Sequence, residues 1–182
     1  MSLDRYASLP NIITLGRLIL VPVVISSMVN GDWPMAFAAF VIAGVSDAVD
    51  GWIAKTFDLR SELGAVLDPI ADKALLISIF ITLAVEGFIP ATLAILTVSR
   101  DVMIVGGVII AWLMDRPVEI NPIFISKVNT AAQIAFAAAV LAAKAFNWPM
   151  TGWLTPAVLV VGALTLASAA AYLASWMRHL SQ

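Results

Sequence analysis

Cysteine is absent from the 182-residue chain, and histidine occurs once, as His179. Without thiols, the chain has no disulfide, no thiolate nucleophile and no thiolate metal ligand. Charged residues make up only 12% of the chain, and its net charge of −2 provides no basic surface for nucleic acid, so we expect no nucleic-acid partner. Carboxylates therefore remain as the main candidates for chemistry.

Hydrophobic residues make up 62% of the chain, whereas a soluble domain is about half apolar and about a quarter charged. This excess indicates contact with a lipid bilayer. Runs of roughly 20 apolar residues are long enough to cross a membrane as helices. We therefore expect an all-α, polytopic membrane protein with six transmembrane helices in one bundle, forming a single domain over 1–182. The expected spans are 11–29, 33–54, 66–87, 90–114, 122–144 and 152–177.

Turn-forming residues separate these runs. They are Asn30-Gly31-Asp32 followed by Pro34, Gly87 followed by Pro90, the segment 115–122, and Asn147-Trp148-Pro149. Such short connections predict that consecutive helices are antiparallel neighbours. The first run, from Ile12 to Val29, is too long for a cleavable signal sequence and is expected to remain as a membrane helix.

The positions of lysine and arginine predict the orientation, because cytoplasmic loops carry an excess of basic residues. With the N-terminus inside, the cytoplasmic side has Arg5, Lys55, Arg60, Arg116 and Arg178, and the outer side has only Lys144. We expect both termini inside and an active site at the cytoplasmic face of a bacterial inner membrane or its equivalent.

Two pairs of aspartates lie where the second and third runs approach the cytoplasmic side. Asp47 and Asp50 are three residues apart, and Asp68 and Asp72 are four apart, so each pair shares a helix face. A hairpin of these two helices would bring all four carboxylates together. Gly51 and Gly64 would allow backbone or ligand to approach closely there.

Four crowded carboxylates require positive charge nearby. Oxygen ligands suit Mg²⁺, Mn²⁺ or Ca²⁺, and two such ions would clamp a pyrophosphate and polarise its phosphorus. A carboxylate that does not bind metal would take a proton from an incoming hydroxyl. Two other interpretations are interfacial acids paired with Lys55, Arg60 and Lys73, and an ion pathway. Transport sites, however, usually lie near the membrane midplane.

These residues resemble the motif of the CDP-alcohol phosphatidyltransferase family, D-x2-D-G-x2-A-R-x8-G-x3-D-x3-D. The chain keeps every spacing and departs from the pattern at one position, where Lys55 replaces the usual arginine. Lysine keeps the positive charge but lacks the planar fork of arginine, so we expect a different grip on phosphate.

The resemblance implies a six-helix, usually homodimeric membrane enzyme that uses two divalent ions, Mg²⁺ or Mn²⁺. Its first three aspartates bind the metals, and its fourth completes the site and acts as general base toward the acceptor hydroxyl. The hydroxyl attacks the lipid-side phosphorus of CDP-diacylglycerol and expels CMP. Carried over, the metal-binding set is Asp47, Asp50, Asp68 and Asp72, with Asp72 as catalytic base. The nucleotide-binding set is Gly51, Ala54, Lys55 and Gly64.

The acceptor has to be inferred from other segments. Residues 9–17 resemble the first helix of phosphatidylglycerophosphate synthases and of cardiolipin synthases with this motif. Asn11, Thr14 and Arg17 recur every three residues as a polar stripe. An arginine facing lipid is costly, so we expect Arg17 to face the bundle and a phosphate. The other interpretation is that the polar stripe only forms hydrogen bonds between helices and binds no ligand.

Residues 99–103 and 124–133 resemble the eukaryotic-type cardiolipin synthases. We expect Lys127 to share a helix face with Thr130 and Gln133 and to neutralise an acceptor phosphate. Arg100 and Asp101, being adjacent, are expected to point apart, and either a helix-locking role or acceptor binding is open for them. The full set expected to bind acceptor or phosphate is Asn11, Thr14, Arg17, Arg60, Lys73, Arg100 and Lys127.

The sequence thus predicts cardiolipin synthesis from CDP-diacylglycerol and phosphatidylglycerol, with membrane lipids as surroundings. The alternative is phosphatidylglycerophosphate synthesis from glycerol-3-phosphate. A small membrane transporter without transferase activity is a remote alternative. A lipid acceptor needs a groove open to the bilayer, whereas glycerol-3-phosphate needs a closed basic cup.

Overall fold

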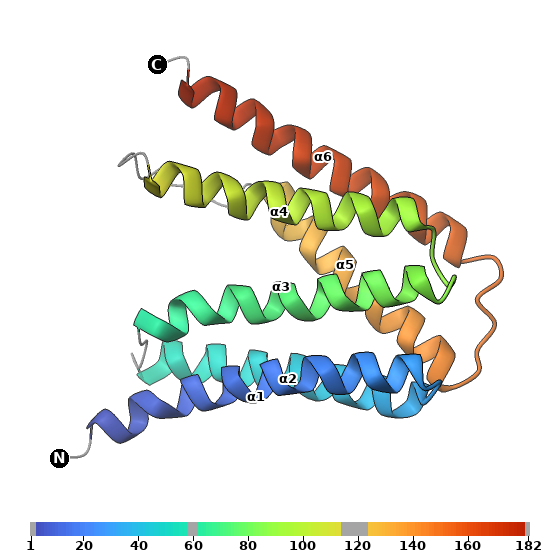
Figure 1. Ribbon diagram of the computed structural model, residues 1–182, viewed down its shortest axis with the longest axis horizontal. Coiled ribbons are helices and arrows are strands. Elements are labelled where there is room, and N and C mark those ends of the chain that lie inside the picture. The colour runs from blue at the N-terminus through green and yellow to red at the C-terminus, as the bar shows by residue number, and fades with distance from the viewer. Residues whose placement is uncertain (1–2, 58–61, 114–123, 181–182) are drawn as a thin grey trace. The chain divides into compact units, whose positions relative to one another are not determined.

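The computed structural model describes residues 3–57, 62–113 and 124–180, with side chains described within 16–49, 73–106 and 124–177. These residues form helices joined by turns and contain no strand, which confirms the all-α prediction (Figure 1). The six helices are α1 (Leu3–Val29), α2 (Trp33–Phe57), α3 (Glu62–Val85), α4 (Ala91–Leu113), α5 (Phe124–Ala145) and α6 (Leu154–Leu180).

Most helices extend beyond the apolar runs that predict them. The helix α1 already begins at Leu3, and α3 begins at Glu62. The reason is that a hydropathy window marks only the apolar part of a helix, while backbone hydrogen bonding continues into polar residues. Pro69 consequently lies in the interior of α3 and not in its first turn. The predicted break over 115–122 lies outside the described residues.

The other three predicted breaks are confirmed, and all of them end a helix in the same way. Gly31, Gly87 and Asn147 adopt positive φ angles of 75°, 76° and 55°. In each case the next backbone N–H donates to a carbonyl five residues earlier, at 2.8 Å for Asp32 to Ser27, 2.9 Å for Phe88 to Leu83 and 2.8 Å for Trp148 to Ala143. This is the Schellman motif, in which a left-handed residue satisfies the last carbonyls of a helix. The helix α2 then starts at once, because Asp32 Oδ1 accepts from the N–H of Met35 at 3.2 Å.

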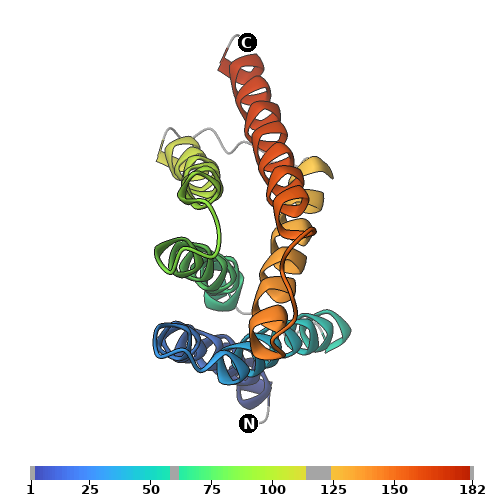
Figure 2. The same ribbon diagram turned by 90° about the vertical axis from the view of Figure 1, so that its right-hand side faces the viewer.

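The chain divides into two compact units, and α3 and α5 contribute to both. The first unit contains Met1–Thr82 and Ala138–Pro149. Within it, α1 and α2 run antiparallel and side by side (Figures 1 and 2). Its interior is mainly aliphatic and aromatic, and the buried apolar residues include Val24, Met28, Ala36, Ala39, Phe40, Leu76, Ile79, Phe80, Val140 and Leu141.

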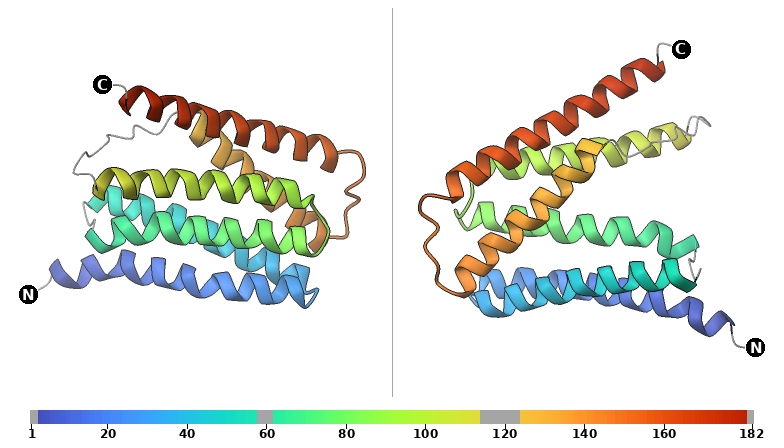
Figure 3. Two further views of the ribbon diagram at one scale, coloured as in Figure 1. Left: turned by 45° about the horizontal axis from the view of Figure 1, so that its top comes forward. Right: turned by 180° about the vertical axis from the view of Figure 1, so that it is seen from behind.

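The second unit contains Leu83–Ala137 and Met150–Gln182. In it, α4 and α6 pack together, and the first half of α5 is hydrogen-bonded to both (Figure 3). Many of its buried residues are polar, namely Thr97, Arg100, Asp101, Ser126, Asn129, Gln133, Thr165 and Ser168. Large apolar residues on the same helices are more than half exposed, among them Ile95, Val102, Leu159, Val160 and Leu166. Such a share of buried polar residues, together with exposed aliphatic residues, is unusual for a water-soluble domain.

Two helical stretches of the described chain are long and apolar enough to cross a membrane, Phe124–Ala145 and Leu154–Met177. Gly16–Val29, Trp33–Val49 and Lys73–Val85 are further apolar stretches, and they are the parts of α1, α2 and α3 whose side chains the structure describes. The described residues form six helices, and six membrane crossings remain a prediction.

Candidate active site

The aspartate motif is divided between two consecutive helices. Asp47 and Asp50 lie on the C-terminal half of α2, and Asp68 and Asp72 lie on the N-terminal half of α3. Gly51, Ala54 and Lys55 follow on α2, and Gly64 precedes on α3. Of these eight motif residues, only Asp47 has a described side chain, so the convergence of the carboxylates stays a prediction. Arg60 falls between the helices, outside the described residues.

Asp47 is in contact with an arginine of the first helix. Arg17 is 1% exposed and belongs to the largest fully buried side chains of the described chain. Its Nη2 lies 2.7 Å from Asp47 Oδ1, while 46% of the Asp47 side chain remains exposed. The arginine thus faces the protein interior, as predicted, and it contacts the first aspartate of the motif. The side chains of Asn11 and Thr14, the other members of the predicted stripe, lie outside the described residues.

The Arg17–Asp47 contact follows from the pairing of α1 with α2. The tight turn at Gly31 makes the two helices antiparallel, so residues near the start of α1 lie beside residues near the end of α2. A buried guanidinium is costly without a counter-charge, and Asp47 supplies one. The first helix therefore reaches the motif through Arg17.

A second group of polar side chains surrounds Arg100 in the other unit. Arg100 Nε donates to Ser168 Oγ at 3.1 Å, and Nη2 donates to the same oxygen at 2.7 Å. Nη2 also donates to Ser126 Oγ, and Nη1 donates to Asp101 Oδ1 at 2.6 Å. The guanidinium carbon lies 5.9 Å from the centre of the Tyr172 ring, within cation–π range. Arg100 thereby joins α4 to α5 and α6.

The prediction that Arg100 and Asp101 point apart is wrong. Their charged groups form an ion pair at 2.6 Å, with both side chains 2% exposed. Successive residues leave a helix in directions about 100° apart, but an arginine side chain is long enough to fold back to its neighbour. Because an unpaired buried charge is costly, Arg100 adopts the rotamer that pairs its guanidinium with the Asp101 carboxylate.

A further polar link lies one helical turn along α5. Thr165 Oγ1 lies 3.0 Å from Asn129 Oδ1 and 2.8 Å from the Val161 carbonyl oxygen, and Gln133 Nε2 lies 3.4 Å from Thr165 Oγ1. Asn129 Nδ2 and Thr97 Oγ1 are buried and have no hydrogen-bond partner among the described residues. These serines, threonines and amides were missed as a group by sequence reasoning, because isolated polar residues in apolar helices do not reveal their partners.

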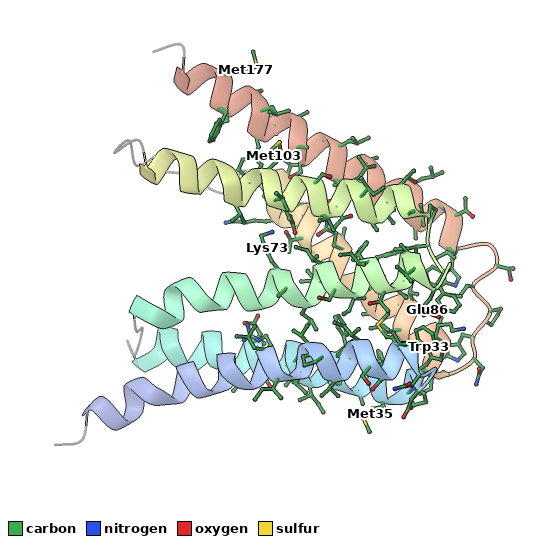
Figure 4. All side chains as sticks on the ribbon, viewed as in Figure 1. Trp33, Met35, Lys73, Glu86, Met103 and Met177 are labelled. Atoms are coloured by element: carbon green, nitrogen blue, oxygen red, sulfur yellow. The ribbon has the colours of Figure 1, made fainter. Side chains whose placement is uncertain are left out.

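Lys127 does not share a face with Gln133, contrary to the prediction. Lys127 is exposed, whereas Ser126 is 9% exposed and Gln133 is 1% exposed. A spacing of three falls about 60° short of a full turn, so two such steps separate residues by about 120°. Lys73, on α3, is partly exposed (Figure 4).

Aromatic residues cluster at the end of the first unit opposite to the motif. Lys144 Nζ lies 4.9 Å from the centre of the Trp33 ring, where Trp33 begins α2 (Figure 4). Phe146 packs edge-on against Phe37 at 5.7 Å and against Trp148 at 5.2 Å between ring centres. Tryptophan and lysine side chains of this kind are typical of membrane interfaces.

The motif supplies carboxylate oxygens, which are the ligands that Mg²⁺ and Mn²⁺ prefer. Asp47 is the motif carboxylate with a described side chain, and it fits a cation as a partner. It is half-exposed, and one of its oxygens already contacts the positive charge of Arg17. Among the described side chains, no three acids or histidines are close enough to hold a metal. The donor set therefore fits a divalent cation by its chemistry.

The fold and motif define the class, a helical protein whose second and third helices carry paired aspartates. A family model described as CDP-alcohol phosphatidyltransferase matches residues 7–173. The chain belongs to this family, whose members are phosphotransferases.

Three relatives with different names illustrate the range of the family. The human "Cardiolipin synthase (CMP-forming)" is 34% identical over 181 residues, which cover 91% of this chain and 60% of the relative. The rice chloroplastic "CDP-diacylglycerol--glycerol-3-phosphate 3-phosphatidyltransferase 1" is 30% identical, covering 93% and 57%. A "Probable phosphatidylglycerophosphate synthase" of Mycobacterium tuberculosis is 31% identical, covering 97% and 85%. The chain thus spans about 60% of the length of the human relative.

Proposed function

We propose that this protein transfers a phosphatidyl group from CDP-diacylglycerol to phosphatidylglycerol, forming cardiolipin and releasing CMP. The observation that carries the proposal is the complete aspartate motif, whose two halves belong to the consecutive helices α2 and α3. The choice of acceptor is supported by the 34% identity to the human cardiolipin synthase and by the Ser99-Arg100-Asp101 segment.

Asp47, Asp50 and Asp68 would hold divalent cations, with Asp72 completing the site. Helical periodicity places positions 47 and 50 on one face of α2, and positions 68 and 72 on one face of α3. Bound Mg²⁺ or Mn²⁺, as two ions, would supply positive charge to the pyrophosphate of the donor.

Other residues of the chain would accept the proton, bind the nucleotide and neutralise the phosphates. Asp72 accepts the proton of the acceptor hydroxyl as that oxygen bonds to the lipid-side phosphorus and the CMP oxygen departs. Arg17 contacts one carboxylate oxygen of Asp47, whose side chain remains 46% exposed. Gly51, Ala54 and Gly64 leave room for the cytidine, and Lys55 neutralises donor phosphate. Lys127, with Arg60 and Lys73, provides positive charge for the phosphate of the acceptor.

The proposed setting is a bilayer. Two helices long enough to cross it and the exposed aliphatic residues of α4 and α6 support this proposal. We further propose six crossings, both termini in the cytoplasm of a bacterial cell or its equivalent, the aspartates at the cytoplasmic face and a homodimer. The tryptophan–lysine cluster at Trp33 and Lys144 then lies at the outer interface.

Phosphatidylglycerophosphate synthesis from glycerol-3-phosphate is the second candidate function. It is favoured by the Mycobacterium tuberculosis relative, of which this chain covers 85%. Both reactions use the same donor, the same aspartates and a phosphate-bearing acceptor, so they differ only in the residues around the acceptor.

The test is an assay of the purified protein with labelled CDP-diacylglycerol, Mg²⁺ or Mn²⁺, and one acceptor at a time. Cardiolipin formed from phosphatidylglycerol, and lost on adding EDTA, is the expected result. Phosphatidylglycerophosphate formed from glycerol-3-phosphate instead would establish the second candidate. No CMP released with either acceptor in the presence of metal would remove the transferase proposal in favour of a transporter.

A further inference from the structure

Arg100 is buried so completely that it has little capacity left for a ligand. It is 3% exposed, and its contacts use the Nε hydrogen, both Nη2 hydrogens and one of the two Nη1 hydrogens. An acceptor phosphate that bound Arg100 would have to displace Ser126, Ser168 or Asp101. These contacts indicate that Arg100 holds neighbouring helices together and does not bind a ligand directly.

The same contacts fix the rotation of α5. Ser126 lies in the first turns of α5 and accepts a charge-assisted hydrogen bond from Arg100. One turn later, Asn129 meets Thr165 of α6. Two anchors on one face of a helix determine both its rotation and its position along its axis.

Lys127 is the residue that this rotation controls most directly. It follows Ser126 in the chain, so its side chain leaves α5 about 100° around the helix from the anchored face. Lys127 is exposed, whereas Ser126 and Asn129 are buried. A change in the rotation of α5 by one residue would carry the Lys127 ammonium several ångströms away.

We propose that Arg100 is a positioning residue, which acts through Ser126 to hold Lys127 in the direction needed to bind the acceptor phosphate. The proposal rests on the proposed function, because that function assigns the acceptor phosphate to Lys127. It replaces direct acceptor binding by Arg100 with an indirect role. Ser168 and Tyr172, on α6, hold the other side of the guanidinium and belong to the support of Arg100.

The test compares two serines that contact the same guanidinium from different helices. Ser126→Ala removes the hydrogen bond from Arg100 to α5 and keeps those to Ser168 of α6. Ser168→Ala does the reverse. We expect Ser126→Ala to raise the KM for phosphatidylglycerol about tenfold, as befits one lost hydrogen bond to a charged group. The KM for CDP-diacylglycerol and the kcat should stay close to those of the unchanged protein. Ser168→Ala should change the acceptor KM less.

A double-mutant cycle decides whether Lys127 carries the effect. If Ser126 acts through Lys127, Ser126→Ala should add little to the acceptor KM in a protein that already has Lys127→Gln. Full additivity of the two changes would overturn the proposal. So would an unchanged or lowered acceptor KM in Ser126→Ala, because freeing a guanidinium that binds phosphate directly should improve binding.

A readout without turnover separates this proposal from the proposed function. Hydrogen exchange measured by mass spectrometry should show faster exchange of the first turns of α5 in Ser126→Ala, and not in Thr97→Val, which removes a buried hydroxyl without a described partner. Equal exchange in the two variants would refute the anchoring of α5. If the unchanged protein uses glycerol-3-phosphate and not phosphatidylglycerol, cardiolipin synthesis fails, and the same KM series with glycerol-3-phosphate decides the role of Arg100.

Discussion

The ion pair between Arg17 and Asp47 should couple the first helix to the aspartate motif by a measurable free energy. With about 4 Å between the charge centres and an effective dielectric constant of about 20, the Coulomb attraction is about 4 kcal/mol. Because 46% of the Asp47 side chain is exposed, solvent screens part of this attraction, and we take about 2 kcal/mol as the coupling.

The perturbation is the cycle of Arg17→Met, Asp47→Ala and the double variant, measured as thermal unfolding in detergent with EDTA present. Each single change removes one partner of a contact in which Arg17 is 1% exposed, so each should destabilise the fold. A coupling of about 2 kcal/mol should make the melting temperature of the double variant about 4–8 °C higher than the sum of the two single shifts predicts, for a chain of this size.

The control uses an acid at the other end of the same helix. Asp32 caps the start of α2, so Asp32→Ala combined with Arg17→Met should be additive within about 0.5 kcal/mol. A coupling between Arg17 and Asp47 no larger than this control would refute the reasoning. Added Mn²⁺ should lower the Arg17–Asp47 coupling if a cation shares the charge of Asp47.

The remaining predictions concern the motif. Asp72→Asn should leave binding of CDP-diacylglycerol unchanged and lower kcat by about 10²–10⁴, the usual contribution of a general base; a kcat near that of the unchanged protein would contradict the role. Asp68→Asn should weaken Mn²⁺ binding, followed by electron paramagnetic resonance, and an unaltered titration would remove Asp68 from the ligand set. Lys55→Arg, which restores the family pattern, should keep or improve the KM for CDP-diacylglycerol, because arginine offers a bidentate grip on phosphate. Loss of donor binding in that variant would mean that the pocket is shaped around lysine.

Local features of the fold were predictable from the sequence because they depend on neighbouring residues. The helix ends at Gly31, Gly87 and Asn147 all use a left-handed residue, which glycine and asparagine adopt at low cost. Apolar runs located the helices but not their ends, as the early start of α3 at Glu62 shows. The motif spacing likewise predicts the family, since it records which residue types recur at fixed intervals.

Contacts between distant residues required the tertiary structure. The sequence predicts that Arg17 faces the bundle and a phosphate, whereas its contact with Asp47 depends on how α1 packs along α2. For Arg100, two roles were equally open, and the hydrogen bonds to Ser126 and Ser168 exist only because three helices meet around it.

The helical character of the chain, most of its turns and the aspartates that define its family are predictable without any contact between distant residues. These properties follow from propensity, hydropathy and spacing, which are read along the chain. The partners of the buried charges and the exposure of Lys127 depend instead on how the helices pack. A buried charge takes the nearest opposite charge or hydrogen-bond partner in space, and which group is nearest depends on helix packing that no local pattern records.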